Sequence, residues 1–238
     1  MNAVGIDFGT TNSAVAVYQS ATGKVFTSDY EPTVIFFEES NQQVYHIGKA
    51  AIQRYVESGL KGRFIRSIKS VLHSKTFEFT YIYGRKYYAE DLVALILSHL
   101  AEKAEQILGE RPQKVVLGRP AKFSPDPERD ALAQKRLAGA AEKAGFSEVS
   151  FQLEPIAAAF SYESSISENE LVFVGDFGGG TSDFTLMQLG PNRAQNNRME
   201  DIAGASGVRV GGDDFDAEIA WGKVVRNLGY GLTYDSTG

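Results

Sequence analysis

The sequence predicts an α/β protein with a mixed β-sheet flanked by helices. Three observations support this expectation. The chain opens with short strands joined by tight turns, strands and helices alternate from Glu90 onward, and one strand–turn–strand motif occurs twice. Alternating strands and helices favour parallel pairing, and an opening meander adds antiparallel strands. No low-complexity linker divides the 238 residues, which are enough to bury a substantial core.

The first elements are predicted to be strands. Apolar residues predict a strand over 4–8, a turn over 9–12 and a returning strand over 13–18, with a third strand after the turn at 21–23. Residues 31–88 hold β-branched and aromatic pieces around a basic stretch, and they predict only a mixed segment.

From Glu90 the pattern becomes periodic. Apolar residues at helical spacing predict a helix that ends at Gly109. The elements expected after it are a strand over 114–117, a helix from Pro127 to Gly145, a strand over 149–153, a helix over 156–162 opened by Pro155, and a strand over 171–175.

Composition excludes several classes of function. The net charge of -6 argues against non-specific binding to nucleic acid or to anionic membranes. The absence of Cys removes disulfides, thiolate metal sites and Cys nucleophiles. No window has the ~18 apolar residues of a membrane span, and the N-terminus lacks the features of a signal peptide. We therefore expect a cytoplasmic protein.

The most informative feature is an internal repeat. Residues 4–13 read VGIDFGTTNS and residues 174–183 read VGDFGGGTSD, and in each an apolar strand ends in Asp-Phe-Gly before a Gly/Thr turn. Glycines let the backbone approach phosphate oxygens, and successive turn N–H groups bind anions. Asp7 and Asp176 supply the carboxylates that hydrated Mg²⁺ prefers. The repeat predicts two lobes that clamp nucleotide phosphates and magnesium.

Each of these turns, taken alone, is also compatible with an ordinary hairpin connection. The recurrence of Asp at the same place in both segments argues for the phosphate interpretation. Other phosphate motifs are absent, because no Gly-x-x-x-x-Gly-Lys-Ser/Thr loop occurs and no Gly-x-Gly-x-x-Gly links a strand to a helix. A Gly-x-Ser-x-Gly hydrolase elbow is also missing.

Four segments in this order resemble the 70-kDa heat-shock (DnaK-type) chaperone family of the actin-like ATPase superfamily. Residues 5–13 and 176–183 resemble its two phosphate motifs, residues 154–159 (EPIAAA) its connecting segment, and residues 211–216 (GGDDFD) the start of a helix. The chain looks most like short bacterial members that lack a peptide-binding domain.

The resemblance implies an actin-like ATPase (ribonuclease H-like) fold. Residues 1–166 would form the first lobe with an inserted subdomain at about 31–112, and residues 167–238 would begin a second, incomplete lobe. ATP or ADP, Mg²⁺ and K⁺ are the implied ligands. Unfolded polypeptides and co-chaperones are the implied partners of a full-length protein.

The resemblance also implies roles for single residues. Lys69 would place the attacking water and offset developing charge, and Glu154 would orient that water or the metal's hydration shell. The catalytic set is completed by Asp176 and Thr181. Asp7 and Asp176 would anchor Mg²⁺ through water, and Asp183 would help to hold a monovalent cation. The nucleotide would be bound by Gly9, Thr10, Thr11, Asn12, Gly178, Gly179, Gly180, Thr181, Gly211 and Gly212.

Structural interpretations compete with some of these roles. Lys69 follows Arg63 and Arg66 at a spacing of three, which is also typical of a solvated basic helix face. Glu154 before Pro155 is a plausible acidic residue in the first turn of a helix, and residues 213–216 are expected to cap one. His46, His73 and His99 have no metal-site spacing and receive no role.

The leading hypothesis is therefore the N-terminal part of the ATP-binding, ATP-hydrolysing domain of a heat-shock-70-type chaperone. A nucleotide-regulated interaction protein with little turnover is an alternative, because Ser70 stands where the family usually has an Arg that flanks adenine. A sugar kinase or filament protein of the same superfamily is another. The family's later adenosine motif is not in these residues, so we expect weak nucleotide binding and little or no ATPase activity from them alone.

Overall fold

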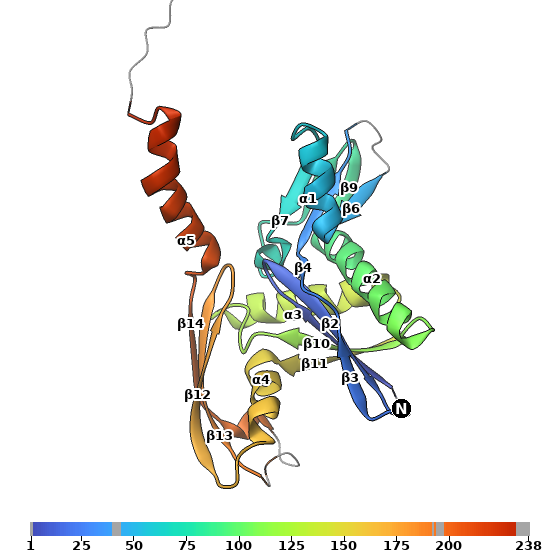
Figure 1. The fold of residues 1–238 in the computed structure, drawn as a ribbon, viewed down its shortest axis with the longest axis vertical. Coiled ribbons are helices and arrows are strands. Elements are labelled where there is room, and N and C mark those ends of the chain that lie inside the picture. The colour runs from blue at the N-terminus through green and yellow to red at the C-terminus, as the bar shows by residue number, and fades with distance from the viewer. Residues whose placement is uncertain (1, 40–43, 192, 194–197, 232–238) are drawn as a thin grey trace, which may run out of the picture.

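The largest unit of the structure is a six-stranded mixed sheet. The computed structural model describes residues 2–39, 44–191, 193 and 198–231 (Figure 1), so residues 232–238 of the predicted second-lobe segment lie outside the described part. The sheet consists of β1 (Ala3–Phe8), β2 (Asn12–Gln19), β3 (Lys24–Thr27), β4 (Glu31–Pro32), β10 (Lys114–Arg119) and β11 (Glu148–Leu153).

The pairing within this sheet explains why it is mixed. The strand order is β11-β10-β1-β2-β3, with β4 paired to β2. β1 runs antiparallel to β2 and parallel to β10, which is parallel to β11. Alternate residues of β1 (Val4, Ile6 and Phe8) are buried, as expected for a strand with one face on the core. The predicted α/β architecture with a mixed sheet flanked by helices is confirmed.

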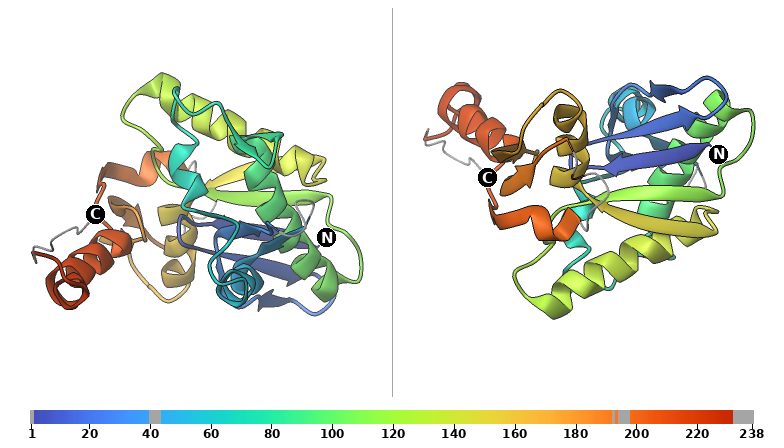
Figure 2. Two further views of the ribbon diagram at one scale, coloured as in Figure 1. Left: turned by 90° about the horizontal axis from the view of Figure 1, so that it is seen from above. Right: turned by 90° about the horizontal axis from the view of Figure 1, so that it is seen from below.

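Two long helices cover one face of this sheet. α2 (Ala89–Leu108) and α3 (Pro127–Lys143) pack side by side (Figure 2). α2 ends where Gly109 adopts a positive φ of 80°, as the sequence predicts. α3 begins after Asp126, whose carboxylate accepts from the Glu128 and Arg129 backbone N–H groups. Both helices match their predicted positions to within two residues.

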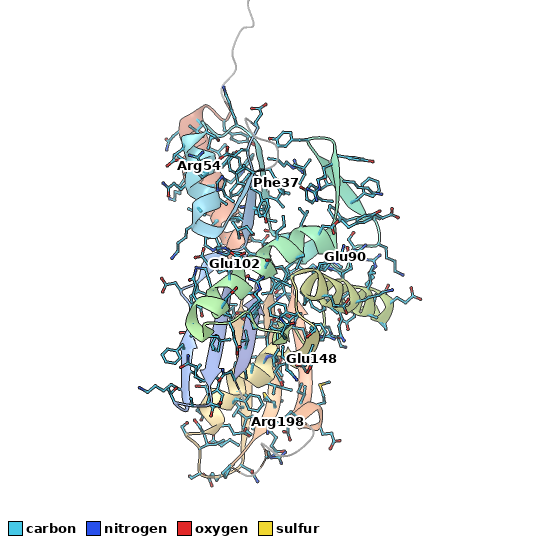
Figure 3. The ribbon with its side chains drawn as sticks, turned by 90° about the vertical axis from the view of Figure 1, so that its right-hand side faces the viewer. Phe37, Arg54, Glu90, Glu102, Glu148 and Arg198 are labelled. Carbon is cyan, nitrogen blue, oxygen red and sulfur yellow. The ribbon has the colours of Figure 1, made fainter. Side chains whose placement is uncertain are left out.

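The segment between β4 and α2 forms a small subdomain that the sequence left as mixed. It contains a three-stranded sheet, a helix, a 3-10 turn and a hairpin. Their bounds are β5 (Val34–Phe37), β6 (Tyr45–Ile47), α1 (Gly48–Glu57), β7 (Arg63–Arg66), η1 (Ile68–Val71), β8 (Phe79–Ile82) and β9 (Arg85–Tyr88). Phe37 is fully buried here, whereas Arg54 on α1 is half-exposed (Figure 3).

A second sheet carries the other copy of the repeat. It has the order β12-β13-β14, with β12 (Glu170–Phe177), β13 (Ser182–Leu189) and β14 (Ile202–Val208). α4 (Glu154–Glu163) lies between the two sheets (Figure 1) and buries Ile156 and Ala159 against Met187 and Leu189. α5 (Gly212–Ile219) follows β14 and continues as irregular helical turns over Ala220–Val224 and Val225–Leu228.

Helices in the described part of the chain are all too short or too polar to span a bilayer.

Arg136 of α3 is a buried arginine that ties this helix to the segment after η1. Its guanidinium donates to the carbonyl oxygens of Leu72, Ser74 and Phe77 at 2.9 to 3.0 Å. It also lies 3.8 Å from the Glu90 carboxylate at the start of α2 (labelled in Figure 3). The hydrogen bonds of the strands and helices do not use these carbonyl oxygens. The Arg136 guanidinium therefore provides their hydrogen-bond donors.

We predict that Arg136→Met lowers the free energy of unfolding by about 2–4 kcal/mol, because it leaves buried carbonyls without donors. Lys135→Met, at the exposed neighbouring position of the same helix, is the matched control and should change stability by less than about 0.5 kcal/mol. Urea denaturation measures both. An equal loss of unfolding free energy in the two variants would contradict this stabilising role of Arg136.

Candidate functional site

The two copies of the repeat fold as hairpins with the same register. Phe8 pairs with Ser13 in the first hairpin, and Phe177 pairs with Ser182 in the second, so each turn has four residues. In the second turn the Gly178 N–H donates to the Thr181 carbonyl at 2.8 Å. The internal repeat read from the sequence is therefore a structural repeat, and it brings Asp7 and Asp176 to equivalent strand ends.

The two turns lie directly against each other. A Cβ atom built on Gly179 would overlap the Thr11 hydroxyl, and one on Gly180 would press on the Thr10 methyl group. Glycine is required at position 179 because of this close approach rather than because of a special backbone angle. The first and second hairpins thus meet turn to turn, as the clamp prediction expects.

Lys69 lies on η1, at the wall of the space beside these turns. Its Nζ donates to Glu154 Oε1 at 2.9 Å, and only 11% of its side chain is exposed. Arg63 and Arg66 belong to strand β7, so the three cations do not share a helix. The solvated basic helix face considered from the spacing is wrong, because the chain changes from strand to 3-10 turn between Arg66 and Lys69.

The local backbone before Lys69 is unusual. Ser67 has φ 56°, a left-handed conformation that costs about 1 kcal/mol for a residue with a Cβ. The Ser70 hydroxyl donates to the Ser67 carbonyl at 2.7 Å and braces this turn. Arg136 holds the other end of the same segment. The segment that carries Lys69 is therefore fixed at both ends.

Glu154 is the first residue of α4, and its position there is determined by Pro155, which favours the first turn of a helix. The N-cap residue makes no side-chain cap hydrogen bond, and Glu154 itself accepts from Lys69. Glu154 therefore lies in the first turn of the helix and pairs with Lys69 at the same time. The two interpretations of Glu154 from the sequence are compatible with each other.

Burial raises the pKa of Glu154, opposed by the nearby Lys69 ammonium and reinforced by Asp7 and Asp176. Burial likewise raises the pKa of Asp7, with Lys69 lowering it and Asp176 raising it. These three carboxyl groups and one ammonium therefore share one electrostatic environment.

A cavity of about 580 Å³ opens between the hairpins and the Lys69 segment. It collects most of the predicted site residues, and these are Asp7, Gly9, Thr10, Thr11, Asn12, Lys69, Glu154, Asp176, Gly178, Gly179, Gly180, Thr181 and Asp183. The structure brings these residues together in one cavity, whereas the role of each residue stays a prediction.

Gly211 and Gly212 are not part of this cavity wall. The Gly211 N–H donates to Asp214 Oδ2 at 2.8 Å, and the Gly212 N–H donates to the Gly178 carbonyl at 3.0 Å. The Gly212 N–H, together with the Asp213 N–H that donates to the Gly179 carbonyl at 2.8 Å, holds the start of α5 against the second turn. Asp214 caps the helix, as expected for residues 213–216. Contact of the two glycines with a nucleotide stays a prediction.

The carboxylates suit a magnesium ion that keeps part of its water shell. Asp7 and Asp176 line the cavity, and the Lys69 ammonium beside them donates to Glu154. Burial is the main cause of the raised pKa of Asp7, and the neighbouring Asp176 adds to it. No cluster of three or more possible metal-ligating side chains occurs in the described part of the chain. Two carboxylates with retained waters are a set that Mg²⁺ accepts.

Asp183 accepts a hydrogen bond from the Thr181 hydroxyl at 2.8 Å and lines the same cavity. It lies opposite Asp176 across β12 and β13. A monovalent cation beside Asp183 stays a prediction.

Sequence reasoning missed several residues that line the cavity. His73, given no role from its spacing, lines the wall, and its Nε2 lies 2.9 Å from Arg209 Nη2. Lys122 and Arg209 also line it. The contact between His73 and Arg209 joins residues 136 positions apart, so no local pattern could have revealed it.

Comparison with models of known protein families gives a match over almost the whole chain. Residues 3–224 match the family described as Hsp70 protein. The paired phosphate-type turns, the carboxylates and the Lys69–Glu154 pair all lie inside the matched range. The chain therefore belongs to the Hsp70 family.

Proposed function

We propose that the chain is an ATP-binding and ATP-hydrolysing domain of a chaperone-type protein. Hsp70 membership implies an actin-like ATPase fold and a nucleotide-binding domain that takes ATP or ADP with Mg²⁺. The observation that carries the proposal is the meeting of two related glycine turns, two carboxylates and the Lys69–Glu154 pair in one cavity. Family membership also favours this function over a sugar kinase or a filament protein.

The lobe organisation is part of the same proposal. Residues 1–166 would form the first lobe with an insertion at about 31–112, and the second lobe would begin at residue 167. The two separate sheets support this division, because each carries one hairpin of the repeat and α4 lies between them (Figure 1).

The residues divide the work of phosphoryl transfer, which needs positioning and charge neutralisation more than covalent chemistry. The turns at 9–12 and 178–181 would hold the phosphates. Lys69 would donate to a terminal phosphate oxygen and offset the charge that develops there. Glu154 would hold the Lys69 ammonium with Oε1 and orient a water with its other oxygen. Mg²⁺ held through water by Asp7 and Asp176 would neutralise phosphate charge when bound.

A nucleotide-regulated interaction protein with little turnover is the second candidate. Ser70 favours it, because its hydroxyl is engaged by the Ser67 carbonyl and supplies no positive charge to the cavity. A single-turnover rate for the unaltered protein separates the two candidates, since slow cleavage with tight ATP binding would support the second.

We predict that, in a full-length protein that contains these residues, Lys69→Met slows ATP cleavage by about a hundredfold or more, since it removes a preorganised donor from the developing charge. ATP affinity should change much less. Lys75→Met is the matched control, because Lys75 is an exposed cation nearby that pairs with Glu128 outside the cavity. Single-turnover assays and calorimetric ATP titrations measure both effects. Cleavage at the unaltered rate in Lys69→Met would refute the role of Lys69.

We predict that magnesium binding weakens as pH falls through the raised pKa of Asp7. The folded state holds this proton more tightly than the unfolded chain, so ionisation above the ordinary value of 3.8 costs the metal-free fold stability as pH rises. Mg²⁺ replaces the proton and relieves this cost. The increase in Tm caused by Mg²⁺ with ADP should therefore grow as pH rises through this raised pKa.

Asp7→Asn tests the same linkage. The variant should be more thermally stable than the unaltered protein in EDTA at neutral pH, and it should lose the increase caused by Mg²⁺ with ADP. Asp29→Asn, at a side chain that is 91% exposed, is the control and should behave as the unaltered protein. Retention of the full magnesium effect in Asp7→Asn would contradict the assignment.

A further inference from the structure

A cluster of buried charged side chains lies at the C-terminal end of α4, outside the cavity. Glu163, the last residue of α4, is buried, and its Oε1 accepts from the Gly190 N–H at 3.0 Å and from the Arg198 guanidinium at 3.1 Å. Arg198 (labelled in Figure 3) belongs to η2 (Arg198–Asp201). A carboxylate is unfavourable at the C-terminus of a helix, where the backbone carbonyls already carry negative partial charge. Glu163 therefore depends on these two donors to compensate its charge.

Two further side chains complete the cluster. Asp201 of η2 is buried, and its Oδ1 accepts from Arg193 Nη1 at 2.6 Å, whereas its Oδ2 lies 3.1 Å from Arg198 Nη1. The cluster thus holds two guanidinium groups and two carboxylates, whose formal charges cancel. Their burial carries a desolvation penalty that offsets much of their attraction, and the loss of one member leaves a buried charge without its partner. The cluster therefore favours the one arrangement of its elements in which every charge is paired.

The same helix is packed on the second sheet. Ile156 and Ala159 are buried against Met187 and Leu189 of β13, and these residues form a core cluster separate from the main one. The N–H of the residue after β13 is one of the donors to Glu163. α4 is therefore fixed to the second sheet by apolar contacts along its length and by Glu163 at its end.

The N-terminal end of α4 carries Glu154, whose carboxylate accepts from Lys69 at 2.9 Å. α4 has 10 residues. At a rise of about 1.5 Å per residue, the two glutamates at its ends are about 14 Å apart along the helix axis. A tilt of the helix at Glu163 therefore displaces the Glu154 carboxylate relative to Lys69, which lies on the separate element η1. Because a hydrogen bond weakens steeply when its distance and angle change, the orientation of α4 determines the strength of this pair.

We propose that Glu163 is a positioning residue, which fixes the orientation of α4 and thereby holds the Glu154 carboxylate at Lys69. Glu163 is not among the residues that line the cavity, so it acts on the site through the helix. The inference rests on the proposed function insofar as Glu154 orients the attacking water there. The positioning itself needs no nucleotide, and it can be measured on the protein without one.

The first experiment measures the coupling energy between Lys69 and Glu154 by a double-mutant cycle. Urea denaturation of the unaltered protein, Lys69→Met, Glu154→Gln and the double variant gives this energy, and the cycle is then repeated with Glu163→Gln in all four proteins. The amide of Gln retains an oxygen for the N–H after β13 but supplies no charge to Arg198. We expect the coupling energy between Lys69 and Glu154 to fall by about half or more in the Glu163→Gln proteins.

Glu170→Gln is the matched control. Glu170 of β12 accepts from the Tyr162 hydroxyl at 2.9 Å, so it also joins the second sheet to α4, but on the exposed surface. The coupling energy in this variant should equal that of the unaltered protein. Glu163→Asp is a second test, which also serves if Glu163→Gln does not fold. It keeps the negative charge and shortens the side chain by a methylene group, so the coupling energy should again fall.

The second experiment measures ATP cleavage in a single turnover, in a full-length protein that contains these residues. We expect Glu163→Gln to slow cleavage by about tenfold while the affinity for ATP changes little, because misplacing a positioned group impairs the reaction more than binding. In the Glu154→Gln protein the same substitution should cause no further loss of rate. A merely structural role of Glu163 would instead slow both proteins by the same factor.

Three results would overturn the proposal. They are an unchanged coupling energy in the folded Glu163 variants, an equal fall of this energy in Glu170→Gln, and an equal loss of cleavage rate with and without the Glu154 carboxylate. A failure of the unaltered full-length protein to bind or cleave ATP would instead count against the proposed function, because the coupling energy is measured without nucleotide.

Discussion

The ion pair between Lys69 and Glu154 is the interaction on which the arrangement of the cavity depends. It connects the segment after β7 to the first turn of α4, across the floor of the cavity. The carboxyl groups of Glu154, Asp7 and Asp176 share the electrostatic environment of this one ammonium. A bound cation would reduce the repulsion between these carboxylates and the polyphosphate of the proposed nucleotide.

Much of the remaining structure positions these few groups. Pro155 and the start of α4 place Glu154, whereas Arg136 and the left-handed Ser67 place the segment that carries Lys69. The hairpins place the aspartates. Each group is held by a different element, and this explains why the site assembles only when the whole chain has folded.

The parts that could be predicted from the sequence are those governed by local patterns. The hairpin turns follow from a few consecutive residues, and α2 follows from an apolar period that continues over its length. The small subdomain could not be predicted, because β5 pairs with both β6 and β7 and these strands are only three or four residues long. Lys69 shows the same limit, since a regular spacing to Arg63 and Arg66 crosses a change of secondary structure.

The repeat also separates what local sequence determines from what tertiary packing determines. Phe8 and Phe177 occupy equivalent positions in hairpins of identical register. Phe8 is fully buried in the main core cluster, whereas Phe177 is 72% exposed. The local pattern specifies the turn and the position of the aspartate. Whether the phenylalanine is buried depends instead on the elements that pack against each hairpin.

The contact between Gly179 and Thr11 constrains how the two hairpins can diverge. Each turn forms part of the surface against which the other is packed, so a larger side chain in one is tolerated only if the other becomes smaller. In related chains, the size of the residue at position 179 should therefore vary inversely with that at position 11. The two halves of the repeat are therefore coupled through this contact, although their sequences differ at other positions.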